Sequence, residues 1–193
     1  MNSRTAQPGS PGAPPPSPGA PAGFRPHDHH ACVEAALRHA EEACAARAAR
    51  LTPVRRRVLE ILLESHAAVG AYELLDRLRA EGWSAQPPVA YRALDFLTEQ
   101  GFVHRIEARN AFIACAHPGE PHHPAFLICR ACGTVAEEET SPAQSSLGRR
   151  ARASGFRVER SVMEVEGLCP ACAGTGADAE GAGGAGENGE FRG

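Results

Sequence analysis

Two pairs of cysteines carry the clearest chemical pattern in the sequence. Cys129 and Cys132 form one C-x-x-C pair, and Cys169 and Cys172 form a second pair after a gap of 36 residues. A spacing of two residues lets both sulfur atoms of a pair point at one ion, and two such pairs complete a tetrahedral shell of thiolates. A redox role would need only one pair. The spacing therefore predicts a closed, structural zinc site.

A second set of metal-binding residue types lies mostly between these pairs and the N-terminal half. It comprises His104, Cys115, His117, His122, His123 and Glu137. Sulfur, nitrogen and oxygen donors in one set suit zinc, and four of the six could close a tetrahedron. Histidines scattered in a loop are more often solvated than bound to metal, so spacing alone leaves this site open. His104 stands apart at the end of the helical half, and an ion held by both groups would fix the angle between two domains.

The elements that position these residues change in character along the chain. Up to about residue 100 the apolar spacing is helical. Helices are predicted over 31–50, from Thr52-Pro53 to Gly70, over 71–80 and from Pro87 to Gly101. Thr52 before Pro53 is typical of a helix start. Two short strands, 102–106 and 111–114, flank a turn at Arg109-Asn110, and the whole predicts a winged helix-turn-helix. A small helical bundle that binds nothing is the alternative.

Beyond the wing the pattern favours strands. They are predicted at 111–115, 125–129, 134–138 and 156–165, with one helix over 142–154. This half is predicted to be a small α+β domain. The expected hinge between the halves is residues 108–110.

The unusual composition lies at the two ends of the chain. Residues 1–26 hold eight of the 16 prolines, and residues 173–193 hold eight of the 20 glycines. Such stretches bury too little apolar surface to offset the entropy of ordering, so both are predicted to be disordered tails. The 146 residues between them suit one domain or two small ones, which excludes a large multidomain enzyme.

The sequence also limits where the protein works. Its apolar runs fall short of the roughly 18 residues of a membrane span, and the N-terminus lacks the apolar segment of a signal peptide. We therefore expect a cytoplasmic protein, in which the seven cysteines are thiols or metal ligands before disulfides. Cys32 and Cys44 have no ligand spacing and are interpreted as packing residues or incidental thiols.

Placement of the charges says more than the formal net charge of −3. Residues 44–57 contain five arginines and no acid: Arg47, Arg50, Arg55, Arg56 and Arg57. Because phosphate neutralisation supplies most non-specific affinity, this cluster favours DNA binding. The helix after Pro87 would enter the major groove, with Tyr91 and Arg92 in its first turn, and Arg92 could pair with guanine. The predicted DNA contacts are Tyr91, Arg92, Arg55, Arg56 and Tyr72.

Several stretches resemble the ferric uptake regulator family, and within it the zinc uptake regulators. They are LTPVR at 51–55, PPVAYRALDFL at 87–97 with EQGFVH at 99–104, FLICRACGTV at 126–135 and GLCPAC at 167–172. The likeness covers nearly all of residues 31–172 and neither tail. The block from Tyr91 to Leu97, together with Cys115, is typical of the zinc branch.

This resemblance implies an α+β fold and a homodimer. It implies an N-terminal winged helix-turn-helix DNA-binding domain over 27–107 and a C-terminal α/β dimerisation domain with structural zinc over 111–172. It also implies two Zn²⁺ ions per subunit. The structural ion falls on Cys129, Cys132, Cys169 and Cys172, and the sensing ion on His104, Cys115, Glu137 and one histidine of the pair His122-His123. Counting back from Cys129 favours His122 and counting forward from Cys115 favours His123; we prefer His122.

Two departures from the family pattern affect details. Members with a further regulatory site have histidine where this chain has Arg160, so that site is expected to be missing or altered. The recognition helix usually begins with Thr where this chain has Val89, which removes a hydroxyl that could contact phosphate.

The hypothesis from the sequence is a zinc-responsive repressor that binds double-stranded operator DNA as a zinc-loaded dimer and represses zinc-uptake genes. It contacts no membrane and has no small-molecule substrate. A zinc enzyme is the first rival, but two sites with four protein ligands each leave no open position for an activated water. A zinc-binding module without DNA is the second. A family member that senses iron, manganese or nickel is the closest competitor, and the Cys115 thiolate favours zinc.

Overall fold

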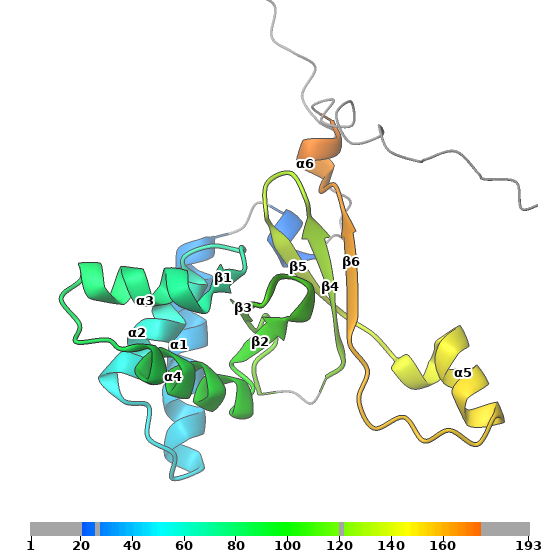
Figure 1. Cartoon of the computed structure of the whole chain (residues 1–193), viewed down its shortest axis with the longest axis horizontal. Coiled ribbons are helices and arrows are strands. Elements are labelled where there is room, and N and C mark those ends of the chain that lie inside the picture. The colour runs from blue at the N-terminus through cyan, green and yellow to red at the C-terminus, as the bar shows by residue number, and fades with distance from the viewer. Residues whose placement is uncertain (1–20, 26–27, 120–121, 175–193) are drawn as a thin grey trace, which may run out of the picture.

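Four helices make up the N-terminal half of the described chain (Figure 1). They are α1 (His29–Ala46), α2 (Pro53–Leu63), α3 (Ala71–Ala80) and α4 (Pro87–Glu99). The computed structural model describes residues 21–25, 28–119 and 122–174 of the 193. Within these ranges, no helix has the length and apolarity that crossing a membrane requires.

Local signals explain where these helices begin and end. The Asp28 side chain accepts a hydrogen bond from the N–H of Ala31 and so caps α1. The helix ends at Ala46, four residues before the predicted end, and Ala48 has a positive φ of 51° that no helix can continue through. The apolar faces of α2, α3 and α4 then meet in one core, with side chains such as Leu62, Leu78 and Leu94 at most 1% exposed.

A three-stranded sheet follows, in the order β1-β3-β2. It contains β1 (Val69–Gly70), which the sequence did not predict, with β2 (Val103–Ile106) and β3 (Ala111–Ala114), the two strands of the wing. Residues 107–109 form a single 3-10 turn, and Asn110 completes the reversal with a φ of 45°. The hinge predicted at 108–110 is therefore the wing turn. Because β2 and β3 pair along their whole length, residues 107–110 connect two strands of one sheet.

The second half is another three-stranded sheet, in the order β5-β4-β6. Its strands are β4 (Pro124–Cys129), β5 (Val135–Glu139) and β6 (Met163–Gly167). β5 pairs antiparallel and β6 parallel with the central strand β4. A crossover with the helix α5 (Ser146–Ala153) makes the parallel pairing possible. The strand predicted over 156–165 is confined to residues 163–167, and a last short helix, α6 (Pro170–Ala173), follows it. The predicted α+β class is confirmed.

The two halves pack against each other through the wing. Ile106 and Ile113 from the wing strands share an apolar cluster with Phe126, Ile128 and Val135 from the second sheet. The loop after α2 also touches this sheet, since the Val135 N–H donates to the His66 carbonyl over 2.7 Å. These contacts fix the wing on one face of the second sheet.

Part of each predicted tail has a defined place. Residues 22–24 form a 3-10 turn against β5, and Gly23 lies so close that an added Cβ would stand 2.8 Å from the Val135 carbonyl oxygen. At the other end, Ala173 closes α6. The rest of the predicted tails, residues 1–20, 26 and 175–193, lies outside the described residues.

Candidate metal centres and nucleic-acid interface

Strand pairing brings the two C-x-x-C pairs together. Cys129 ends β4 and lies beside Gly167 at the end of the parallel strand β6. The Arg130 N–H donates to the Gly167 carbonyl over 2.9 Å and extends this pairing by one step. Cys169 therefore follows β6 at the point where the chain after β4 turns back. The 36 residues between the two pairs form β5, α5 and β6 and the segments that connect them.

The four cysteine sulfur atoms form a compact group within 4.8 Å of one another. Sγ of Cys132 and Sγ of Cys169 are 3.7 Å apart, close to the edge of roughly 3.8 Å expected for a tetrahedron with zinc–sulfur bonds of about 2.3 Å. Burial opposes ionisation of Cys129, but N–H groups of Cys132 and Cys169 donate to its sulfur and lower its pKa to about 6. Hydrogen bonds with the neighbouring cysteines raise the pKa of the Cys172 thiol to about 12. The fit to a zinc ion therefore rests on the geometry of the four sulfur atoms and on the thiolate character of Cys129.

The second donor set takes residues from both halves of the molecule. His104 lies on β2, and Cys115 follows β3. On the other side, His122 precedes β4 and Glu137 lies on β5. One donor atom from each of the four lies within 4.8 Å of the other three. We refer to this group as the mixed site.

Distances within the mixed site fit a single ion. His104 Nε2 is 3.2 Å from His122 Nε2 and 3.4 Å from a carboxylate oxygen of Glu137. Cys115 Sγ is 3.5 Å from His122 Nε2 and 3.9 Å from the Glu137 oxygen. Ligand bonds of about 2.0–2.3 Å give tetrahedral edges of roughly 3.3–3.8 Å, so these separations match a zinc shell. The contact between His122 and Glu137, at 2.7 Å, is a hydrogen bond.

Glu137 is the only buried charged residue among the described residues. Burial raises the cost of its charge, but His104 and the Ala116 N–H donate to the carboxylate, and its pKa lies below the usual range. Burial and the neighbouring Glu137 charge raise the pKa of the Cys115 thiol to about 12. A thiol held protonated beside a buried carboxylate needs a cation to become a thiolate, and a metal ion supplies that charge.

The structure separates the two adjacent histidines of the loop before β4. The His122 ring lies among the donors of the mixed site, whereas His123 is exposed and its backbone carbonyl accepts hydrogen bonds from Thr140. His117 is exposed as well, with its ring centroid 6.2 Å from that of His122. This geometry favours His122 as the ligand.

The helix α4 presents Tyr91 and Arg92 to solvent. Because α4 begins at Pro87, both residues lie in its second turn rather than in the predicted first turn. Tyr72, in the first turn of α3, is 70% exposed. A tyrosine exposed to this extent at a helix start can donate to a phosphate.

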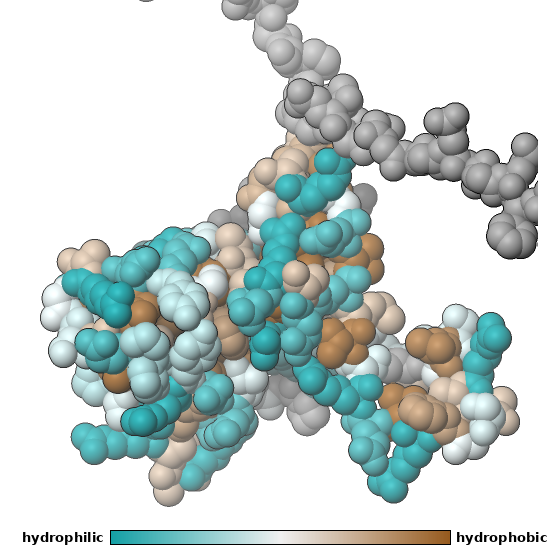
Figure 2. Space-filling model, in the orientation of Figure 1, coloured by the Kyte–Doolittle hydropathy of each residue, from teal (hydrophilic) through white to brown (hydrophobic). Residues whose placement is uncertain are grey.

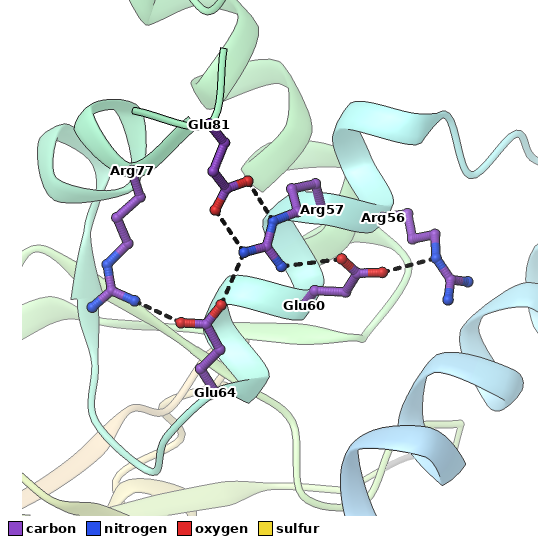
Figure 3. A network of polar contacts seen from close by, with 6 residues as sticks. All are labelled: Arg56, Arg57, Glu60, Glu64, Arg77 and Glu81. Atoms are coloured by element: carbon purple, nitrogen blue, oxygen red, sulfur yellow. Dashed lines mark hydrogen bonds and ion pairs between the residues drawn. The ribbon is translucent and has the colours of Figure 1, made fainter. Parts of the chain in front are cut away.

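The arginine cluster is largely occupied by contacts within the chain. Arg56 pairs with Glu41 on α1. It also pairs with Glu60, and Arg57 pairs with Glu60, Glu64 and Glu81 (Figure 3). The Arg55 guanidinium lies 3.6 Å from the centre of the Phe96 ring and donates to the Arg50 carbonyl. These pairs neutralise much of the charge from which the sequence predicted phosphate contacts.

One group of contacts between the halves has no counterpart in the sequence prediction. Carboxylate oxygens of Glu164 on β6 accept hydrogen bonds from the backbone N–H groups of Glu107 (2.6 Å) and Ala108 (2.9 Å) in the wing turn. Arg160 pairs with Glu107 over 2.8 Å, and Arg109 with Glu166 over 3.4 Å. Charged residues on an exposed strand carry no signal of a distant partner, so the sequence could not reveal them.

The molecule joins a winged helix-turn-helix to a small sheet domain. The mixed site takes donors from both parts, and the four-cysteine site lies within the sheet domain. This combination is typical of metal-binding regulators. The chain belongs to the ferric uptake regulator family, whose sequence profile matches residues 46–166.

Within this family, the chain is similar to several zinc uptake regulators. The zinc uptake regulation protein of Escherichia coli (strain K12) is 44% identical over 137 residues, which cover 70% of this chain and 80% of that protein. A solved zinc uptake regulator complexed with zinc and DNA is 42% identical, with a TM-score of 0.70, over 75% of this chain and 97% of that one. A crystal structure of holo XcZur is 46% identical in sequence, with a TM-score of 0.63, and the match covers 71% of this chain and 96% of that chain.

Proposed function

We propose that this protein is a zinc-responsive transcriptional repressor that binds operator DNA as a dimer and represses zinc-uptake genes. The observation that carries the proposal is the mixed site, whose donors come from the wing and from the sheet of the second half. The similarity to a zinc uptake regulator solved with zinc and DNA supports both the metal and the partner.

Two zinc ions per subunit fit the two donor sets. The four cysteines belong to one sheet and its flanking turns, so an ion there would stabilise that half alone. The mixed site differs, because His104 moves with the wing and Glu137 with the second sheet. A zinc ion bound in the mixed site would be coordinated by all four donors at once and would so tie the two halves together. His104, Cys115, His122 and Glu137 would then hold the winged helix in one position relative to the dimer.

This position matters because a dimer must match two half-sites on DNA. Recognition helices of such dimers contact half-sites about one helical turn apart. If the wing is free, only a fraction of molecules has the correct spacing, and apparent affinity falls by that fraction. We propose that the two halves are joined through residues 115–123, which include Cys115 and His122. Zinc binding would thereby restrain the connection itself.

For contacts with DNA we propose Arg92 and Tyr91 on α4, Tyr72 on α3, and Arg55 with Arg56 in a lesser role. Arg92 is exposed and can make the bidentate contact with guanine. Arg56 would have to leave Glu41 and Glu60 to reach a phosphate. The contribution of the arginine cluster to affinity is therefore expected to be small.

Exposed apolar side chains on the second half support a dimer. On the arm formed by α5, β6 and the segment between them, six are more than a third exposed: Leu147, Phe156, Val158, Val162, Met163 and Val165. Figure 2 shows hydrophobic surface on this arm, which extends away from the helical half. Apolar patches of this kind mark protein interfaces, and we propose that a second copy of the chain covers it.

We propose zinc over iron, manganese or nickel because a thiolate with imidazoles selects softer metals. A cytoplasmic location agrees with the seven free cysteines, since disulfides are rare in reducing compartments. An enzymatic role finds no support, because the family consists of regulators and each proposed site has four candidate protein ligands.

Operator binding across buffered free zinc, combined with metal content per subunit, tests this function. We expect two zinc ions and a DNA affinity that rises with zinc. Arg92→Ala should weaken specific binding by about 1–3 kcal/mol without changing zinc content, and Arg38→Ala on α1 is the matched control. A response of operator binding to iron and not to zinc would contradict the proposal.

A further inference from the structure

Three residues that pair across the second sheet form one row, and the residues at both ends of this row contact the wing. Phe126 on the central strand β4 pairs with Glu137 on β5 and with Glu164 on β6. Directly paired residues point to the same face of a sheet, so these three side chains lie side by side on one face. Phe126 is buried against the wing residues Ile106 and Ile113, which identifies this face as the one that carries the wing.

The two ends of the row hold different parts of the wing. At one end, Glu137 contacts His104 on β2 and belongs to the mixed site. At the other end, Glu164 accepts the N–H groups of Glu107 and Ala108. These are the first two N–H groups of the 3-10 turn, and such groups have no partner within the turn itself. The Phe126 ring lies between these contacts, with its centroid 5.5 Å from that of His104.

The contacts at the Glu164 end need no metal. A carboxylate that accepts two backbone N–H groups makes charge-assisted hydrogen bonds, which are stronger than neutral ones. Arg160 pairs with Glu107, and Glu166 pairs with Arg109, so ion pairs flank the carboxylate on the same turn. We call Glu164, Arg160 and Glu166 the wing latch.

We propose that Glu164 is a positioning residue: the wing latch holds the wing on the second sheet without metal and thereby sets how readily the mixed site closes on zinc. The second part of this inference rests on the proposed function. The latch fixes the turn three residues after His104 on the same hairpin, so it restricts His104 to the neighbourhood of Glu137. Latch and zinc favour the same arrangement, and by linkage each must strengthen the other.

Amide hydrogen exchange tests the latch directly. In the zinc-loaded full-length protein, Glu164→Ala should speed exchange at the Glu107 and Ala108 amides about three- to tenfold, while the amides of α2 and α4 keep their rates. Glu164→Gln keeps an acceptor oxygen and should give an intermediate change. Glu159→Ala removes the same charge from the exposed segment before β6 and is the matched control. Unchanged protection of both wing amides in Glu164→Ala would overturn the latch.

Zinc titration tests the coupling. With Glu164→Ala, the free zinc concentration that fills the second site should rise about three- to tenfold, and that for the four-cysteine site should not change. Faster wing exchange with unaltered zinc binding would overturn the coupling and leave the latch intact. If the wild-type protein bound only one zinc, the proposed function would fail instead, and the exchange result would still decide the latch.

Discussion

The two donor clusters differ in what they join. The four cysteines lie at one end of a single sheet, where pairing of β4 with β6 already brings Cys129 close to Cys169. The mixed site collects His104 from the wing and Glu137 from the other half, which meet only when the halves dock. Contacts within one half should therefore act on the stability of that half. Contacts between halves should act on their arrangement, and through it on DNA binding.

The largest expected effect is loss of the cysteine site. Cys169→Ser should remove one zinc ion per subunit and lower the melting temperature by roughly 10 °C or more, because binding free energy at a structural site is folding free energy. Thermal unfolding and zinc content measure this. Cys32→Ser, which changes an exposed cysteine outside both clusters, should melt like the wild type. If Cys169→Ser kept the melting temperature of the wild type, the four-cysteine site would not stabilise the second half.

Loss of the mixed-site thiol should have the opposite pattern. Cys115→Ser should leave most of the thermal stability unchanged. It should weaken zinc binding at the mixed site by about 10–100-fold or more, because loss of a residue that only supports a ligand already costs this much. Operator binding should then no longer respond to zinc in the range where the wild type does. Equally tight operator binding by Cys115→Ser and by the wild type, at the free zinc concentration that fills the wild-type mixed site, would show that operator binding does not depend on this site.

The two adjacent histidines allow a sharper test of which loop residue joins the halves. His122→Ala should weaken zinc binding at the mixed site by about tenfold, less than the thiol variant, since water can fill the vacated position. His123→Ala should change it by less than about twofold, because the exposed ring of His123 contributes no donor to the cluster. A reversed order of these two variants would reassign the ligand.

The smallest expected effect concerns an ion-pair network inside the helical half. Hydrogen bonds from Arg57 hold the pKa of the Glu81 carboxyl below its usual range. A carboxylate with a lowered pKa in the folded protein stabilises it above the unfolded pKa, and this contribution is lost as pH falls through the folded value. Glu81→Gln should therefore lower the melting temperature by a few degrees at most near pH 7, because the pair is exposed.

This difference between Glu81→Gln and wild type should vanish on acidification. DNA affinity at neutral pH should stay unchanged, since the network lies within one half. A loss of zinc-dependent DNA binding in Glu81→Gln would show that contacts inside the helical half also control the arrangement.

Much of the architecture followed from local patterns. Thr52-Pro53 and Pro87 marked helix starts that the structure retains, and the two C-x-x-C spacings anticipated the cysteine cluster. The predicted mixed-site residues also meet in one place. Their spacing alone could not decide between His122 and His123, because both belong to one irregular loop. The structure favours His122 by the direction of its ring.

The arginine cluster shows why charge in a sequence is hard to interpret. Residues 44–57 contain no acid, so their charge looked available for phosphate. The partners of Arg57 come from later in α2 and from the end of α3, where Glu81 lies 24 residues away. Such pairs form only when the helices pack, and no local pattern indicates them.

By itself, the sequence determined the helix starts, the wing and the two cysteine pairs, because each depends on residue types at short spacing. Tertiary structure alone decided which arginines are neutralised and how Glu164 meets the wing turn. These depend on strand register and on docking between the halves, where a shift of one residue would turn Glu137 and Glu164 to the opposite face of the sheet.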